Sequence, residues 1–294
     1  MSLTANHGPF SEQPRGRLNF ELDSPSLLLY LDPMPYRVRV LFEGETIVDA
    51  FEPLLLHEGG RLPVYHFKPD EVHRDFLEPF ESKSESKGIV EYWTVRVGDR
   101  VAPDAARAYS QPVEGAALLE GLFTFDWNAM DEWFCEDEQL FGHARDPFSR
   151  IDTYKTSRHL RISLEGELLA ETRRAIVLYE TGLPPRYYIP AEDVRADLLI
   201  PSGSRSRCAY KGSASYWSVQ IGERVVEDLV WAYLDPERDA EPVRDLLCFF
   251  NERVDLEIEG EPAERPVTQW TRDQESNGDG TQALRGLMRD RVAS

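Results

Sequence analysis

The chain has few cysteines and few lysines. The scarcity of cysteine limits the kinds of disulfide and metal site that the chain can form. Its three cysteines, Cys135, Cys208 and Cys248, are far apart in 294 residues and form no Cys-x-x-Cys pair. This scatter argues against a disulfide framework and a metal-knuckle pattern, so we expect a reduced, cytoplasmic setting with no bound metal and no cofactor. With a formal net charge of −20, nucleic acid is disfavoured as a partner.

Long hydrophobic runs and catalytic motifs are also missing from the sequence. No apolar run approaches the roughly 18 residues of a membrane span, and the polar first twenty residues do not resemble a signal peptide, so we expect no membrane partner. The histidines form no constellation, and the chain has no Ser-His-Asp arrangement and no glycine-rich phosphate loop. The sequence leaves the oligomeric state open.

The strongest positive signal is an internal duplication. Residues 40–79 align without a gap with residues 162–201, since Gly44 and Gly166 are 166 − 44 = 122 positions apart. A second block recurs 124 positions later, where Lys87-Gly88 matches Lys211-Gly212. Self-similarity at a fixed shift marks a repeat architecture, so the chain contains two tandem copies of one small domain. Because the chain has only five lysines, a lysine at equivalent positions is not expected by chance.

The duplication divides the chain into five segments. We expect an N-terminal extension over 1–35, a divergent first repeat over 36–133, an acidic linker over 134–154, a motif-complete second repeat over 155–260 and a disordered tail over 261–294. Each copy has about 100 residues, which is long enough to form a hydrophobic core of its own.

Local patterns predict a mainly β fold of small antiparallel domains. Val38, Val40 and Phe42 alternate with polar residues before the turn Glu43-Gly44-Glu45, which is a hairpin signal. One short helix is expected in each repeat. In the second repeat it begins near Pro190 and stops at Pro201, since proline suits the first turn and cannot continue a helix.

Several motifs in the second repeat resemble a known family. They are Glu180-Thr181-Gly182, Tyr187-Tyr188-Ile189-Pro190, Cys208-Ala209-Tyr210-Lys211-Gly212-Ser213-Ala214-Ser215-Tyr216-Trp217 and Trp231-Ala232-Tyr233. Together they resemble the signature of the domain of unknown function 427 family, which also carries a nucleotidyltransferase-like label. The resemblance covers about 160–258, and the first repeat matches more loosely.

The resemblance implies a β-tent fold and brings no established reaction. That fold type is shared with B-class methionine sulfoxide reductases and a thalidomide-binding domain. β-Tent proteins often hold zinc through paired Cys-x-x-Cys motifs, and without such motifs this chain is expected to hold no structural zinc.

A ligand pocket is expected in the second repeat. Gly212 and Ala214 lie between Tyr210 and Tyr216 on one face of an extended strand, where two small residues would leave a recess. The expected ligand-binding residues are Glu180, Arg186, Tyr187, Tyr188, Cys208, Lys211, Tyr216, Trp217 and Trp231. The first repeat has His66, Val90 and Arg107 where the second has Tyr188, Ala214 and Trp231. We therefore expect the site to survive in the second repeat and to have diverged in the first.

Three functions remain open from the sequence. The first is binding of a small molecule in the aromatic-lined pocket. The second is an enzyme, for example of group or nucleotidyl transfer, with Cys208 or Lys211 as nucleophile and Glu180 as acid or base. The third is a structural or interaction protein, in which Tyr216 and Trp217 are core residues, Lys211 covers aromatic surface and Cys208 is a small buried side chain.

Overall fold

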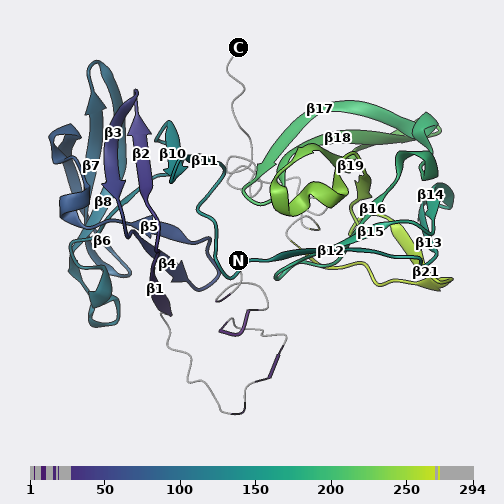
Figure 1. Cartoon of the computed structure of the whole chain (residues 1–294), viewed down its shortest axis with the longest axis horizontal. Coiled ribbons are helices and arrows are strands. Elements are labelled where there is room, and N and C mark those ends of the chain that lie inside the picture. The colour runs from purple at the N-terminus through teal and green to yellow at the C-terminus, as the bar shows by residue number, and fades with distance from the viewer. Residues whose placement is uncertain are drawn as a thin grey trace. The chain divides into compact units, whose positions relative to one another are not determined.

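The computed structural model describes residues 3, 8–10, 16, 17, 19, 28–268 and 271. The chain divides into two compact units, Met1–Ser149 and Arg150–Ser294. Each unit is built mainly from antiparallel strands, and both contain the same elements in the same order (Figure 1). The predicted tandem β architecture is therefore confirmed. The tail predicted from residue 261 lies mostly outside the described residues.

The first repeat contains eleven strands and three short 3-10 helices. They are β1 (Leu29–Pro33), β2 (Val38–Phe42), β3 (Glu45–Ala50), β4 (Leu54–Glu58), β5 (Val64–His66), η1 (Pro69–Glu71), η2 (Arg74–Phe76), β6 (Leu77–Glu85), β7 (Gly88–Val97), β8 (Arg100–Pro112), η3 (Glu114–Leu119), β9 (Phe123–Phe125), β10 (Glu132–Cys135) and β11 (Glu138–Leu140).

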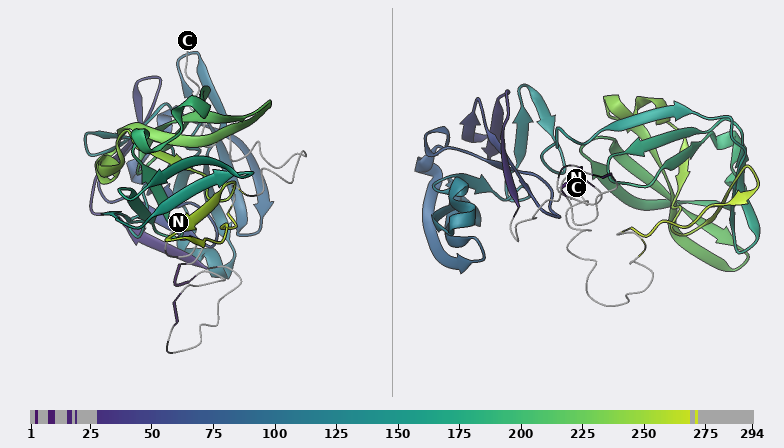
Figure 2. Two further views of the ribbon diagram at one scale, coloured as in Figure 1. Left: turned by 90° about the vertical axis from the view of Figure 1, so that its right-hand side faces the viewer. Right: turned by 90° about the horizontal axis from the view of Figure 1, so that it is seen from below.

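The second repeat has the corresponding elements. They are β12 (Ile151–Lys155), β13 (Leu160–Leu164), β14 (Glu167–Thr172), β15 (Ile176–Glu180), β16 (Arg186–Ile189), η4 (Ala191–Asp193), η5 (Ala196–Leu198), β17 (Leu199–Cys208), β18 (Gly212–Ile221), β19 (Arg224–Pro236), η6 (Arg238–Val243), β20 (Leu247–Phe249), β21 (Asp255–Ile258) and β22 (Glu261–Pro262). The long strands β17, β18 and β19 lie side by side in Figures 1 and 2.

Each repeat folds as a large sheet and a small sheet. In the second repeat the orders are β12-β15-β16-β20-β19-β18-β17 and β14-β13-β21-β22. In the first repeat the large sheet is interrupted between β5 and β9, giving β1-β4-β5 and β6-β7-β8-β9, and the small sheet is β11-β10-β2-β3. Phe67 and Phe123 still exchange backbone hydrogen bonds of 2.8 and 2.9 Å across that interruption, so both large sheets have one topology.

The strands extend beyond the expected repeat boundaries. In the first repeat, β1 pairs with β4, although residues 1–35 were expected to be an extension. The expected linker over 134–154 contains the end of β10, the whole of β11 and nearly all of β12. Of these strands, β10 and β11 belong to the small sheet of the first repeat, and β12 pairs with β15 of the second.

The expected helix of each repeat is instead two single turns of 3-10 helix. In the second repeat η4 and η5 are separated by Val194, which is extended (φ −115°, ψ 141°) and forms a β-bridge with Ala170. Val72 makes the same bridge with Val48 in the first repeat. This cross-strand pairing breaks the helical run, and Pro201 then lies inside β17 rather than ending a helix.

The predicted hairpins are present. Glu43 and Gly44 join β2 to β3 with φ angles of 51° and 78°, and Glu165 and Gly166 join β13 to β14 with 54° and 84°. Two consecutive positive φ angles are typical of the tight turn that matches strand twist.

Each repeat buries two hydrophobic clusters. The larger one involves residues of both sheets, from Met34 to Ala144 in the first repeat and from Leu160 to Leu256 in the second. The smaller one includes residues of η3 or η6 together with inward-facing residues of the large sheet. The two repeats differ most in this smaller cluster.

Candidate ligand-binding site

The smaller clusters of the two repeats correspond position by position. Eight buried residues form it in the second repeat: Leu178, Tyr188, Ala214, Trp231, Tyr233, Ala240, Val243 and Cys248. The first repeat keeps an apolar residue at five of these positions, namely Leu56, Val90, Tyr109, Ala116 and Leu119. The three remaining positions are His66, Thr124 and Arg107, which replace Tyr188, Cys248 and Trp231. We call these three residues the polar row.

The polar row runs across three neighbouring strands. Arg107 on β8 pairs in register with Thr124 on β9. In the second repeat Trp231 and Tyr188 both pair with Cys248, which fixes the same order of positions. His66 and Thr124 are 3% and 2% exposed, and the Thr124 hydroxyl has no hydrogen-bond partner among the described residues. Two buried polar side chains, His66 and Thr124, and the exposed Arg107 thus stand where the twin repeat has buried core residues.

In the second repeat this space is filled by aromatic side chains. Trp231 Nε1 donates a hydrogen bond of 3.2 Å to the Tyr188 hydroxyl, and the two rings meet edge to face with centroids 6.2 Å apart. Phe250 packs on the other side of Trp231, with ring centroids 4.5 Å apart. Buried tyrosine and tryptophan need such partners for their polar atoms, and here they satisfy one another.

A buried ion pair completes the filling of the second repeat. Arg186 on β16 donates two hydrogen bonds of 2.7 Å to Glu252, and its guanidinium lies 5.5 Å from the ring centroid of Trp231. Thr268 Oγ1 donates a third bond of 2.7 Å to the same carboxylate. Burial raises the pKa of Glu252, but the bonds from Arg186 outweigh this and lower the pKa overall, so Glu252 stays charged. The first repeat has Val64 where the second has Arg186.

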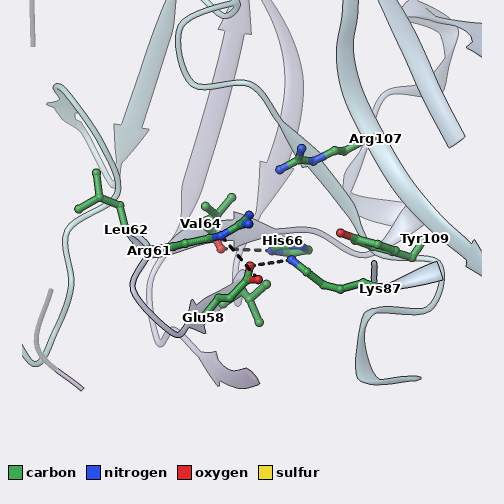
Figure 3. Close-up of a pocket in the computed structure, with 9 residues that line it drawn as sticks. Glu58, Arg61, Leu62, Val64, His66, Lys87, Arg107 and Tyr109 are labelled. Carbon is green, nitrogen blue, oxygen red and sulfur yellow. Dashed lines mark hydrogen bonds and ion pairs between the residues drawn. The ribbon is translucent and has the colours of Figure 1, made fainter. Parts of the chain in front are cut away.

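The first repeat has a cavity of about 70 Å³ at the polar row (Figure 3). Leu56, Glu58, Arg61, Leu62, Val64, His66, Lys87, Arg107 and Tyr109 line it. Figure 3 shows the Arg107 guanidinium and the Tyr109 hydroxyl both directed toward His66. The lining therefore combines aliphatic side chains with a larger set of charged and hydrogen-bonding groups.

His66 is neutral at physiological pH. Burial, together with the smaller effect of the charges of Arg107 and Lys87, lowers the pKa of its imidazole to about 4. Its Nδ1 lies 3.2 Å from the carbonyl oxygen of Val64, which can only accept. The proton of the neutral ring is thus on Nδ1, and Nε2 has a free lone pair.

A lysine–glutamate ion pair is common to both repeats. Lys87 Nζ lies 2.6 Å from Glu58 in the first repeat, and Lys211 bonds to Glu180 in the second. Each lysine precedes a glycine that the fold requires. A Cβ on Gly88 would lie 2.2 Å from the Gln111 carbonyl oxygen, and one on Gly212 would lie 2.8 Å from that of Asp235. The recurrent Lys-Gly dipeptide therefore marks a shared structural pair, and in the first repeat this pair lines the cavity.

The recess expected at Gly212 and Ala214 is closed. Ala214 is 1% exposed inside the smaller cluster, and the backbone of β19 lies directly against Gly212. The structure thus places the cavity in the first repeat and the packed core in the second, the reverse of the expected assignment. The reason is that Trp231, expected to be a pocket wall, lies in the pocket space itself.

The residues expected to bind a ligand divide between the two clusters of the second repeat and their surroundings. Glu180, Lys211, Arg186, Tyr188 and Trp231 are buried partners in the second-repeat core. Tyr187 and Trp217 pack in the larger cluster instead, and the Tyr216 hydroxyl hydrogen-bonds to Ser206 at 2.6 Å. Cys208 is partly exposed at the end of β17.

The residues of the first-repeat cavity were not proposed as a site from the sequence. A signal was present, because the inward-facing positions of β5, β9 and β8 become polar in only one of two otherwise similar copies. We read those changes as decay. The sequence did not single out Arg61 as a site residue, and the second repeat has Leu183 at the equivalent position.

The described residues contain neither a cluster suited to a metal ion nor a helix suited to crossing a membrane. Between residues 28 and 268 no group of three or more His, Cys, Asp or Glu side chains is placed to hold a metal ion. No helix in that part of the chain has the length and apolar character needed to cross a bilayer.

Comparison with known proteins agrees with the duplication. No curated protein matches the chain. The family model described as Domain of unknown function (DUF427), whose short name includes a nucleotidyltransferase label, matches residues 30–136 and again residues 152–260. These two segments contain nearly all the strands of the two repeats. The chain therefore belongs to the domain of unknown function 427 family and contains two tandem copies of its domain.

Proposed function

We propose that this chain binds a small molecule and that the ligand enters the cavity of the first repeat. The observation that carries the proposal is the polar row. His66, Thr124 and Arg107 occupy positions that are Tyr188, Cys248 and Trp231 in a twin domain of the same fold. Of this row, His66 and Arg107 line the cavity, and a ligand there supplies partners to the buried imidazole and to the exposed guanidinium.

The cavity suits recognition of part of a small molecule. Its volume of about 70 Å³ is enough for an end group of a few atoms, and Arg61 at its edge keeps a side-chain exposure of 66%. The remainder of a larger ligand would lie outside. The Glu58–Lys87 pair holds two of the polar walls in place before any ligand arrives, which limits the entropy lost on binding.

Catalysis is the second candidate, and the geometry supports it less. Burial lowers the pKa of Lys211, but the attraction of Glu180 and their hydrogen bond outweigh this and raise the pKa overall. A nucleophilic lysine needs the opposite shift. Cys208, the other candidate nucleophile, lies at the end of β17 in the second repeat and does not line the first-repeat cavity.

The test compares the wild type with the double variant His66→Tyr, Arg107→Trp, which copies the residues of the second repeat. Thermal unfolding is followed with a panel of small acids, amines, sugars and nucleotides. A ligand present at 100 times its Kd stabilises a domain by about 2.7 kcal/mol. We expect at least one compound to stabilise the wild type and to have no effect on the double variant.

Two controls keep the test informative. Arg96→Trp makes the same substitution on β7, away from the cavity, and should keep the response. Tyr109→Phe removes a single hydroxyl from the cavity and should weaken the response even if the double variant folds poorly. A compound that stabilises the wild type and the folded double variant equally would bind elsewhere, and that result would overturn the proposal, as would a panel with no response.

A further inference from the structure

The charges around the first-repeat cavity do not balance. Arg61, Lys87 and Arg107 contribute three positive charges, and Glu58 is the only carboxylate in the lining. Glu58 already lies 2.6 Å from Lys87 Nζ and 3.6 Å from Arg61 Nε. Arg107 forms no ion pair with any described residue. Positive charge therefore remains at the site in a protein whose formal net charge is −20.

Arginine is suited to a ligand with a planar anionic group. Its guanidinium presents donors in a rigid fork that matches the two oxygens of a carboxylate. The three cationic side chains come from different elements: the turn after β4, the turn before β7, and β8. Figure 3 shows the guanidinium groups of Arg107 and Arg61 on the same side of His66, and both side chains line the cavity.

The neutral His66 ring adds a requirement for a donor. Because its Nδ1 proton is directed to the Val64 carbonyl oxygen at 3.2 Å, its other nitrogen can only accept a hydrogen bond. A carboxylate cannot satisfy that nitrogen. A hydroxyl group next to the carboxylate can, and it would also lie within the small volume that the cavity provides.

We propose that the first-repeat cavity binds the end of a small 2-hydroxycarboxylic acid, with the carboxylate between Arg61 and Arg107 and the hydroxyl donating to His66 Nε2. This assignment rests on the proposed binding function and specifies its ligand class. Tyr109, whose hydroxyl makes no hydrogen bond with another described residue, supplies a further donor to the anion.

The experiment is calorimetric titration of the full chain with glycolate, acetate, glycolamide and inorganic phosphate. Glycolate and acetate differ by the hydroxyl, and glycolate and glycolamide differ by the charge. We expect glycolate to bind about 10-fold more tightly than acetate, because one buried hydrogen bond is worth about 1.4 kcal/mol. Glycolamide should bind at least 10-fold more weakly than glycolate.

Variants assign the binding to the cavity. Arg107→Gln should weaken glycolate binding at least 10-fold, Arg107→Lys should restore part of it, and Arg96→Gln, which removes one charge from β7, should leave it unchanged. Equal affinity for glycolate and acetate, equal affinity for glycolate and glycolamide, or tighter binding of phosphate than of glycolate would each overturn the assignment.

Failure of this assignment can be distinguished from failure of the proposed function. If an amine, sugar or other compound binds the wild type but not the His66→Tyr, Arg107→Trp variant, the cavity binds a ligand and only the 2-hydroxy acid assignment is wrong. If no compound shows binding that depends on the cavity, both are wrong.

Discussion

Trp231 Nε1 donates a hydrogen bond of 3.2 Å to the Tyr188 hydroxyl, and this pair fills in the second repeat the space that is open in the first. Arg107 and His66 stand at the same two positions of the first repeat and face a cavity of about 70 Å³. Two substitutions at neighbouring positions thus separate a packed core from a candidate site on one fold.

Trp231 is expected to stabilise the second repeat and to have no part in ligand binding. Trp231→Ala should lower the free energy of unfolding of the second repeat by about 3–5 kcal/mol, because it opens a cavity and leaves the Tyr188 hydroxyl without its donor. Leu234→Ala on the same strand should cost no more than about 0.5 kcal/mol, since Leu234 is 49% exposed. Urea denaturation measures both values. Equal effects of the two substitutions would contradict the packing described for Trp231.

The Lys211–Glu180 pair should behave as a structural ion pair. Removing one partner, by Lys211→Met or Glu180→Gln, should cost about 3–5 kcal/mol because the other charge is left buried, and the double variant should cost less than the sum. A double-mutant cycle from chemical denaturation gives the interaction free energy. Additive effects would show that the two side chains do not interact.

The pH dependence of this pair provides a second check. The folded pKa of Lys211 is raised above its unfolded value of about 10.4. Its stabilisation is therefore fully present below that pH and is lost only as the pH rises through the still higher folded pKa. The difference in unfolding free energy between wild type and Lys211→Met should stay constant from pH 7 to about 10. A decline beginning near pH 8 would indicate a lysine with a lowered pKa and would favour the enzyme hypothesis.

His66 should make the first repeat sensitive to mild acid. Its folded pKa of about 4 lies below the unfolded value of about 6.5, so between these values the unfolded chain binds a proton that the folded chain does not. Stability should therefore fall as the pH falls from about 6.5 to 4, by up to about 3 kcal/mol. His66→Phe should flatten this dependence in denaturation curves measured at each pH. His73→Asn, at an exposed position, is the control and should leave the slope unchanged.

Gly88 should tolerate no side chain. Its φ is +127°, and an added Cβ would lie 2.2 Å from the Gln111 carbonyl oxygen, so strand β8 would have to move. Gly98 also has a positive φ, +56°, but an added Cβ there meets nothing within 4 Å. Gly98→Ala should therefore cost about 1–2 kcal/mol from backbone strain alone, and Gly88→Ala should cost clearly more. Comparable costs would mean that strand β8 can move away from residue 88 at little cost in free energy.

The sequence predicts the fold well where the signal is local. The turns at Glu43-Gly44 and Glu165-Gly166 need only the residues beside them, and the Lys87 and Lys211 recurrence identified a true ion-pair position in both copies. The helix expected near 190–199 is present as two single 3-10 turns, because Val194 between them joins a bridge to Ala170 on another strand. The spacing of apolar residues along the sequence does not reveal such a contact.

The candidate site depended on contacts between residues far apart in the sequence. Arg186 and Glu252 are 66 positions apart, and Trp231 and Tyr188 are 43 apart. Neither pairing follows from the alternation of residues along a strand. The sequence therefore does not distinguish an aromatic side chain that fills a space from one that lines it. A comparison of the two copies located the differing positions but did not show whether their side chains fill a space or line one.

The hydrogen bond from Thr268 to Glu252 connects a segment at the surface with a buried charge. Thr268 lies eight positions beyond residue 260, where the second family match ends, yet its hydroxyl donates to a carboxylate whose side chain is 0% exposed. Truncation of the chain at the family boundary would remove this donor and open a path for water to Arg186 and Glu252. A fragment intended to fold like the intact second repeat should therefore extend through Thr268.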